Sequence, residues 1–319
     1  MTAGRTSTPG GPAQGAFAGM PTPLYAASPS RLLAWLDCPR RYRMAYLDRP
    51  RPPTRPQRAH TSIGVAVHSA LRDWWQLPPP RRTPAAGGDL VAAGWVDVGF
   101  RDPRQSADWR ARTVGAVTAY LRGVDPAGRP VGTERTVAFK TDTLAFFGRI
   151  DRLDDRGGSL VVVDYKTGRR APTEQDARTS LPLALYAAAV WKMFRRRCVR
   201  VELHHVPTAT VAAYEHSDDS LVRKVREAES VTRDLRGADA RHAADGPDAD
   251  GFAPRVSPLC PWCDYRAQCR DGQLAGPEKP SWAALEESAD EPGIDEDRTG
   301  PGGQAEPDPD PAPGSDPAG

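Results

Sequence analysis

One segment constrains this chain more than any other: residues 148–166 predict two β-strands joined by a tight turn. The segment reads GRIDRLDDRGGSLVVVDYK, and the Gly-Gly pair at 157–158 is typical of a two-residue hairpin turn. A hairpin centred there pairs residues whose numbers add to 315, which places Asp151 directly opposite Asp164. Opposed residues in antiparallel strands bring their Cβ atoms to about 4.5–5.5 Å. Lys166, two residues past Asp164, shares its face, so two carboxylates and an ammonium are predicted to converge.

The residues alone allow two interpretations of this convergence. One is a surface hairpin with solvated charges. The other is a site for a hard divalent cation, because two close carboxylates repel each other unless a cation lies between them. The segment Leu160–Val163 is apolar on both faces, as expected of a buried strand, and residues 143–147 are also apolar. Charges that follow a core strand are costly when unpaired, which favours the metal site.

The cysteines form a second pattern with metal-ligand spacing. Cys260, Cys263 and Cys269 follow a Cys-x2-Cys-x5-Cys spacing, and three such close thiolates need a fourth ligand, for which Cys38 is the natural candidate. Disulfides are disfavoured because the five cysteines are odd in number and no secretory signal is recognised. Zinc and an iron–sulfur cluster both remain open from the spacing. Cys198, which follows a basic run, is expected to be a small buried residue.

The hairpin and the cysteines together resemble one group of nucleases. Asp151, a spacer and Asp-x-Lys at 164–166 resemble the core of the PD-(D/E)xK superfamily, in which two acids bind Mg²⁺ or Mn²⁺ and the lysine assists attack on the phosphodiester. One early cysteine with a later Cys-x2-Cys-x5-Cys resembles the RecB-like and Cas4-like branches that carry a [4Fe–4S] cluster. The resemblance covers residues 28–269 and favours iron–sulfur over zinc. It implies metal ligands at Asp151 and Asp164, a catalytic Lys166, and cluster ligands at Cys38, Cys260, Cys263 and Cys269.

Three further positions match this family to different degrees. His68 lies on a predicted helix over 62–75; a lone histidine on an apolar face is usually a core residue, but Gly-x3-His resembles a family motif in which the histidine binds the metal. Glu134 begins a predicted strand where the family often has an acid, and a surface glutamate is an equally good interpretation. Tyr186 matches the tyrosine of a Gln-x3-Tyr helix motif, whereas Pro182 replaces the glutamine.

Composition divides the chain into three parts. Residues 1–22 and 277–319 are predicted to be disordered, and residues 23–276 to form one nuclease domain. Residues 286–319 hold eleven acids and one arginine, a net charge of −10; because the whole chain carries +2, residues 1–285 carry +12. A basic body suits a ligand with a phosphate backbone.

The order of elements predicts the fold class. Helices are expected over 62–75, 92–122, 180–191 and 219–235, and strands near 133–137, 143–153, 160–166, 200–206 and 208–215. This order predicts an α/β fold with a mixed sheet. The resemblance implies that the sheet is restriction-endonuclease-like and flanked by helices, and that the four cysteines join the N- and C-terminal parts. No apolar run is long enough to span a membrane, and reduced thiols favour the cytoplasm.

The patterns and the resemblance lead to a functional hypothesis. We expect an Mg²⁺- or Mn²⁺-dependent deoxyribonuclease, an exonuclease that prefers single-stranded DNA ends and acts in repair or recombination. A Walker-type phosphate loop is absent from the sequence, so a helicase motor would be a separate partner. The alternative is a nuclease-fold DNA-binding subunit with an iron–sulfur or zinc staple and little catalysis, which Pro182 favours and the intact Asp151, Asp164 and Lys166 oppose.

Overall fold

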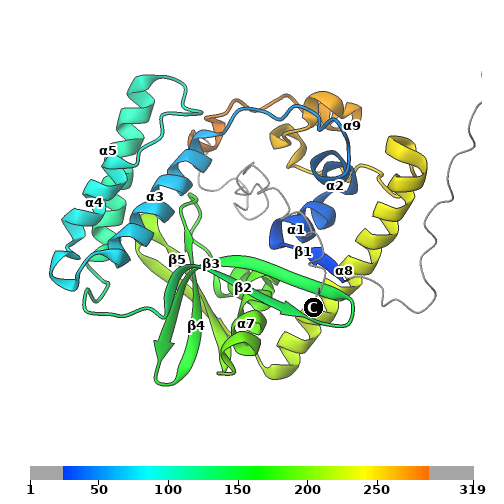
Figure 1. The fold of residues 1–319 in the computed structure, drawn as a ribbon. Coiled ribbons are helices and arrows are strands. Elements are labelled where there is room, and N and C mark those ends of the chain that lie inside the picture. Colours follow the sequence, from blue (N-terminus) through cyan, green and yellow to red (C-terminus); the bar gives the residue numbers. More distant parts are fainter. Residues whose placement is uncertain (1–23, 287–319) are drawn as a thin grey trace, which may run out of the picture.

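The chain folds around a six-stranded mixed sheet (Figure 1). A computed structural model describes residues 24–286. The strand order is β1-β3-β4-β5-β6, and β2 pairs with the long β3. The β1–β3 and β4–β5 pairs are parallel and the others are antiparallel, which confirms the predicted mixed α/β fold. The strands are β1 Tyr25–Ala27, β2 Gly132–Lys140, β3 Leu144–Arg156, β4 Ser159–Lys166, β5 Cys198–His205 and β6 Thr210–Glu215.

Helices cover both faces of the sheet. One group comprises α3 Ala59–Gln76, α4 Pro84–Ala93 and α5 Pro103–Leu121; the other comprises α1 Pro29–Asp37, α2 Pro39–Tyr46, α6 Glu174–Thr179, α7 Leu181–Phe194 and α8 Asp218–Asp245. Short helices complete the chain: α9 Arg270–Leu274 and the 3₁₀ turns η1 Pro79–Arg81, η2 Val206–Thr208, η3 Gly246–Asp248, η4 Cys260–Trp262, η5 Arg266–Gln268 and η6 Ala283–Leu285. Within residues 24–286, none of the helices has the length and apolar character of a membrane span.

Strand β4 lies between two hydrophobic cores. Leu160 and Val162 face a core shared with α7 and α8, whereas Val161, Val163 and Tyr165 face a core built on α3 and α5. Because successive side chains of a strand alternate between faces, both faces of β4 are buried, as its apolar sequence predicts. The carboxyl end of this strand therefore delivers Asp164 and Lys166 to the boundary of the packed interior.

The β3–β4 hairpin has the predicted register. The pairs run from Arg156–Ser159 to Arg152–Val163, and each adds to 315. Gly157 and Gly158 have φ angles of +62° and +90°, so the turn needs residues without a Cβ penalty at positive φ. Regular pairing ends just before Asp151 and Asp164, where the two strands begin to separate.

Three sequence predictions need correction. The helix predicted over 92–122 is interrupted by a loop at residues 94–102, and a new helix begins after Asp102, whose side chain accepts a hydrogen bond from the Gln105 N–H. Helix α8 continues ten residues beyond Leu235, to Asp245. The folded domain also extends past residue 276, because Leu285 belongs to the α3–α5 core. The predictions of disorder for residues 1–22 and 287–319 lie outside the described residues.

Candidate active site and cysteine cluster

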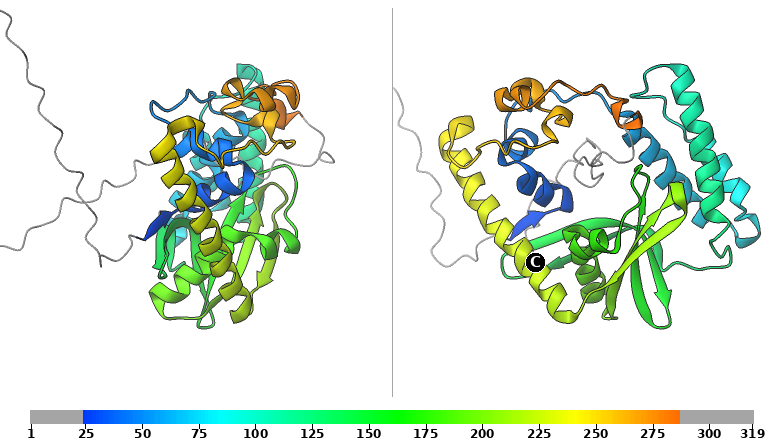
Figure 2. Two further views of the ribbon diagram at one scale, coloured as in Figure 1. Left: turned by 90° about the vertical axis from the view of Figure 1, so that its right-hand side faces the viewer. Right: turned by 180° about the vertical axis from the view of Figure 1, so that it is seen from behind.

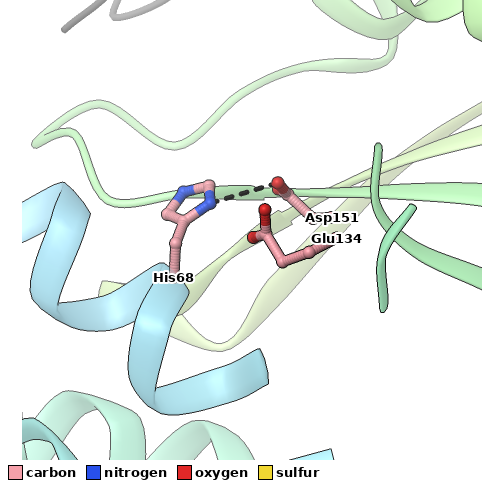
Figure 3. Close-up of side chains that lie close together, drawn as sticks. All are labelled: His68, Glu134 and Asp151. Carbon is pink, nitrogen blue, oxygen red and sulfur yellow. Dashed lines mark hydrogen bonds and ion pairs between the residues drawn. The ribbon is translucent and has the colours of Figure 1, made fainter. Parts of the chain in front are cut away.

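His68, Glu134 and Asp151 meet at one point on three different elements (Figure 3). His68 projects from α3, Glu134 from β2 and Asp151 from β3. One ligand atom of each lies within 4.8 Å of the other two, and His68 Nδ1 is 3.2 Å from Asp151 Oδ1. An imidazole and two carboxylates at this spacing form a donor set suited to a divalent ion such as Mn²⁺ or Mg²⁺.

The local backbone opens the sheet at this point. Strand pairing is regular on both sides, at Thr133–Arg152 and Arg135–Ile150, but not at Glu134–Asp151. Glu134 has a φ of +48°, a left-handed conformation that a non-glycine residue adopts at some energetic cost. The Tyr165 N–H donates to Asp151 Oδ2 at 2.7 Å instead of continuing the β3–β4 ladder. The strained backbone thus turns the Glu134 carboxylate towards Asp151 and His68.

The three side chains perturb one another's protonation. Burial would lower the pKa of His68, but the charges of Asp151, Asp164 and Glu134 outweigh it and raise this pKa to about 9. For Asp151, burial would raise the pKa, yet the His68 charge and the hydrogen bonds that the carboxylate accepts lower it below its usual range. Burial and the nearby Asp151 charge raise the pKa of Glu134. The raised pKa values of His68 and Glu134 both owe part of their shift to neighbouring carboxylate charge, which a bound cation would neutralise.

Asp164 and Lys166 form an ion pair beside this group. Lys166 Nζ lies 3.0 Å from Asp164 Oδ2, and the two side chains are only 15% and 19% exposed. Asp164 lies outside the 4.8 Å group, although its charge contributes to the raised pKa of His68. The structure thus brings His68 and Asp151 together as predicted and adds Glu134, the residue for which the sequence favoured neither interpretation.

Tyr186 lies on α7 and packs against strand β3. Its ring packs 6.1 Å from the Phe146 ring and against Gly148, where a Cβ would approach Tyr186 Cε1 to 2.5 Å. Gly148 precedes Asp151 by three residues on β3, so Tyr186 supports the strand that carries the acid. Pro182 occupies the first turn of α7, as predicted, after Ser180, whose side chain caps the helix.

The four predicted cluster cysteines line one pocket. Cys38 lies between α1 and α2, and the segment with Cys260, Cys263 and Cys269 packs beside them (Figure 2). Backbone N–H groups approach all four sulfurs. The N–H groups of Arg255, Ser257 and Gly272 lie with their nitrogens 3.4 Å from the sulfurs of Cys38, Cys260 and Cys269, in that order. The Tyr265 N–H donates to Cys263. Such donors stabilise thiolates that bind a metal or a cluster.

The sulfurs are spread more widely than zinc requires. A tetrahedral site with Zn–S bonds of about 2.3 Å needs all sulfurs about 3.8 Å apart. In the described part of the chain, no three cysteine sulfurs lie within 4.8 Å of one another. Cys198 is fully buried in β5 and burial raises the pKa of its thiol to about 12, which confirms it as a core residue.

Comparisons with known proteins place the chain in a family. Two solved structures resemble it: SSO0001, with 14% identity and a TM-score of 0.33 over 78% of this chain and 87% of that one, and the "Putative exonuclease" from Eubacterium rectale, with 10% identity and a TM-score of 0.43 over 77% and 88%. None of the curated proteins matches it. The model of the "PD-(D/E)XK nuclease superfamily" matches residues 26–270, which include the acids, the lysine and all four cluster cysteines, and the chain therefore belongs to that superfamily.

Proposed function

We propose that this protein is a metal-dependent deoxyribonuclease whose active site is formed by His68, Glu134, Asp151, Asp164 and Lys166. The observation that carries the proposal is the convergence of an imidazole and two carboxylates beside a half-buried carboxylate–lysine pair, in a chain of a nuclease superfamily. Its substrate would be the phosphodiester backbone of DNA, which the +12 charge of residues 1–285 would attract.

His68, Glu134 and Asp151 would hold Mg²⁺ or Mn²⁺, and Asp164 would add a further carboxylate beside the ion. The donor set fits because hard divalent ions prefer carboxylate oxygen and Mn²⁺ also accepts imidazole. A bound ion would supply Lewis acidity at the scissile phosphate. The raised pKa of His68 means that the imidazole holds a proton in the metal-free site, and it must release that proton before it can act as a ligand.

Lys166 would supply the positive charge that acts on the attacking water and on the phosphate. Asp164 holds its ammonium in place, so the three N–H donors have a fixed position at the site. From there the ammonium can orient the attacking water or stabilise negative charge that develops on the phosphate oxygens. Tyr186 would act as a positioning residue through its contact with the Gly148 backbone of β3.

Cys38, Cys260, Cys263 and Cys269 would hold a [4Fe–4S] cluster. The wide sulfur spacing supports a cubane over zinc, and the N–H donors would stabilise the bound thiolates. The cluster would be structural, because phosphodiester hydrolysis needs no redox step. It would join the α1–α2 region to the segment after α8 as a RecB-like or Cas4-like staple, in a protein that stays in the reducing cytoplasm.

The proposed function also includes a DNA substrate and a cellular process. We infer an exonuclease that prefers single-stranded ends, acts in DNA repair or recombination, and works with a separate helicase. Degradation of end-labelled single- and double-stranded DNA with Mg²⁺ or Mn²⁺ tests it. The expected result is metal-dependent loss of label, fastest on single strands, and none with chelator. DNA binding without any cleavage would instead indicate a nuclease-fold binding subunit.

A further inference from the structure

Strands β2 and β3 carry a second feature next to the candidate active site: an exposed row of side chains, the β2–β3 face. It consists of Thr136, Ala138 and Lys140 on β2, and Phe147 and Arg149 on β3. In the described chain, Phe147 is one of the few large hydrophobic residues that are exposed, with 38% of its surface accessible, and the Arg149 side chain is 66% exposed.

Strict alternation along both strands separates this face from the core. The intervening residues Val137, Phe139, Phe146 and Ile150 are buried in the core that α7 shares with the sheet. Cross-strand pairing places Thr136 beside Arg149, and Ala138 beside Phe147. Helix α7 lies below these strands in Figure 1, on the side of the buried residues. The exposed ring therefore has a small neighbour, Ala138, which leaves its surface accessible to a flat ligand.

The row points at the candidate active site. Arg149 Nε contacts Glu134 Oε2 at 3.0 Å, and Glu134 belongs to the His68–Asp151 group. At about 3.3–3.4 Å per strand residue, Arg149 is about 7 Å and Phe147 about 13 Å from Asp151 along β3. A strand of nucleic acid that reaches the acids along β3 would meet the ring first and the guanidinium next.

We propose that the β2–β3 face binds the single-stranded part of a DNA substrate: Phe147 stacks on a base, and Arg149 and Lys140 contact phosphates. An exposed aromatic ring flanked by cations is the chemistry that holds single strands, since every base has a π-face and every linkage a charge. A duplex keeps its bases stacked inside, so the ring discriminates in favour of single strands. The location of this subsite rests on the proposed nuclease function, whereas its binding chemistry does not.

Binding of a labelled oligodeoxynucleotide to the whole protein, in chelator so that no cleavage occurs, tests the proposal. Phe147→Ala should weaken single-strand binding about fivefold or more, with blunt-duplex binding unchanged within about twofold. Phe147→Trp should restore it. Arg149→Gln and Lys140→Gln should each reduce the slope of log affinity against log salt by about 0.7, whereas Phe147→Ala should leave the slope unchanged.

Matched controls lie on α8, on the other side of the sheet. Val222→Ala and Arg223→Gln alter an exposed apolar and an exposed basic residue there and should leave binding unchanged. Quenching of a 2-aminopurine base in the oligonucleotide should occur with the natural protein and disappear with Phe147→Ala.

Three outcomes would overturn the proposal. If Phe147→Ala lost the same binding affinity for single strands and for duplex, stacking of Phe147 on a base would be excluded. If Phe147→Ala kept its affinity for single strands and still quenched 2-aminopurine, the bases would stack on another part of the protein. Unchanged binding combined with conversion of a dimer to a monomer in sedimentation would make the face a contact between chains. Failure of the nuclease function is separable, because absence of cleavage with intact Phe147-dependent binding would leave this inference standing.

Discussion

Lys166 and Asp164 show how one ion pair would prepare the proposed catalytic lysine. The contact of 3.0 Å fixes the ammonium, and low exposure keeps competing water away from it. Fixed charges in such a site act on a developing negative charge without first having to reorient, which is where enzymes gain most from electrostatics. Under the proposed function, the pair would therefore serve the chemistry more than the stability of the strand.

Removing either member of this pair should abolish cleavage and preserve the fold. Lys166→Met keeps the aliphatic stem, and Asp164→Asn keeps the shape, but each should lower the rate of DNA hydrolysis about 10²–10³-fold or more. Single-strand affinity in chelator should change little. Lys192→Met, which removes an ammonium that lies over Phe139, is the control and should remain active. Undiminished activity of purified Lys166→Met would remove this lysine from the site.

His68 offers a separate test of metal binding. If the imidazole is a ligand, His68→Ala should raise the Mn²⁺ concentration needed for half-maximal cleavage, and excess Mn²⁺ should recover part of the rate. His242→Ala removes a histidine that contacts Asp48 elsewhere and should leave the Mn²⁺ titration unchanged. A His68→Ala protein that loses thermal stability but keeps the original Mn²⁺ dependence would make His68 a packing residue.

Some residues of the candidate site could be placed from the sequence, and others could not. The β3–β4 register, which runs up to Asp151 and Asp164, followed from local information, because two adjacent glycines favour a tight turn with positive φ. Glu134 could not be placed in the same way. Its position depends on long-range β2–β3 pairing and on a left-handed φ at a glutamate, neither of which has a sequence signature.

At the scale of elements, the contact between β3 and α7 holds the acid-bearing strand in place. Gly148 leaves room for the Tyr186 ring, and Pro29 of α1 also lies within 3.3 Å of where a Cβ would be. Two elements therefore close on β3 at a residue whose lack of a side chain permits the approach.

Filling this space should destabilise the protein. Gly148→Ala should lower the free energy of unfolding by about 1–3 kcal/mol, because Tyr186 and Pro29 must move away. Gly115→Ala is the matched control: it lies within α5 with nothing within 4 Å of the added methyl, so it should be neutral or stabilising by up to about 1 kcal/mol. Urea unfolding of both variants measures the two changes in the free energy of unfolding. Equal stability of the two would show that Tyr186 yields freely.

The junction between β6 and α8 should make stability depend on pH. Burial, helped by the charge of Lys224, lowers the pKa of His216 to about 4, against about 6.5 in the unfolded chain. A folded-state pKa below the unfolded value means that the unfolded chain binds the proton first. The stabilising contribution is complete above pH 6.5 and is lost as the pH falls towards 4.

His216→Phe should remove this pH dependence. The ring can keep its edge-to-face contact with Tyr214, although the hydrogen bond with Ser220 is lost and costs about 1 kcal/mol at every pH. Between pH 7 and pH 5 the natural protein should lose about 2 kcal/mol more stability than the variant. Urea titrations at the two pH values measure this. Parallel losses in both proteins would mean that His216 titrates normally.

Elements outside the sheet were harder to predict than the strands within it. The apolar run of β4 fixed a buried strand, but the helix expected over 92–122 ignored Asp102-Pro103, a cap and first-turn pair that begins α5. The segment at 277–286 looked like part of a polar tail because its composition is polar. Its order comes from two apolar side chains, Trp282 and Leu285, that pack against α3.

At the scale of the whole molecule, the cysteine pocket connects both ends of the domain to the active-site helix. Arg58, buried at the start of α3, donates to the Trp262 carbonyl and to Asp264, within the segment that carries Cys260 and Cys263. Helix α3 then runs from Arg58 to His68. Helix α3 therefore links the cysteine segment directly to the candidate metal site.

Loss of the proposed cluster should disturb the whole domain. Protein purified without oxygen should be brown with about four irons per chain. Cys38→Ser or Cys269→Ser should remove the colour, lower thermal stability and weaken cleavage, because ligand binding energy is also folding energy when the ligands are far apart in sequence. Cys198→Ser, a core residue outside the pocket, should stay brown. Colourless protein with one zinc would replace the cluster but keep the staple; colour retained in Cys38→Ser and lost in Cys198→Ser would overturn the choice of fourth ligand.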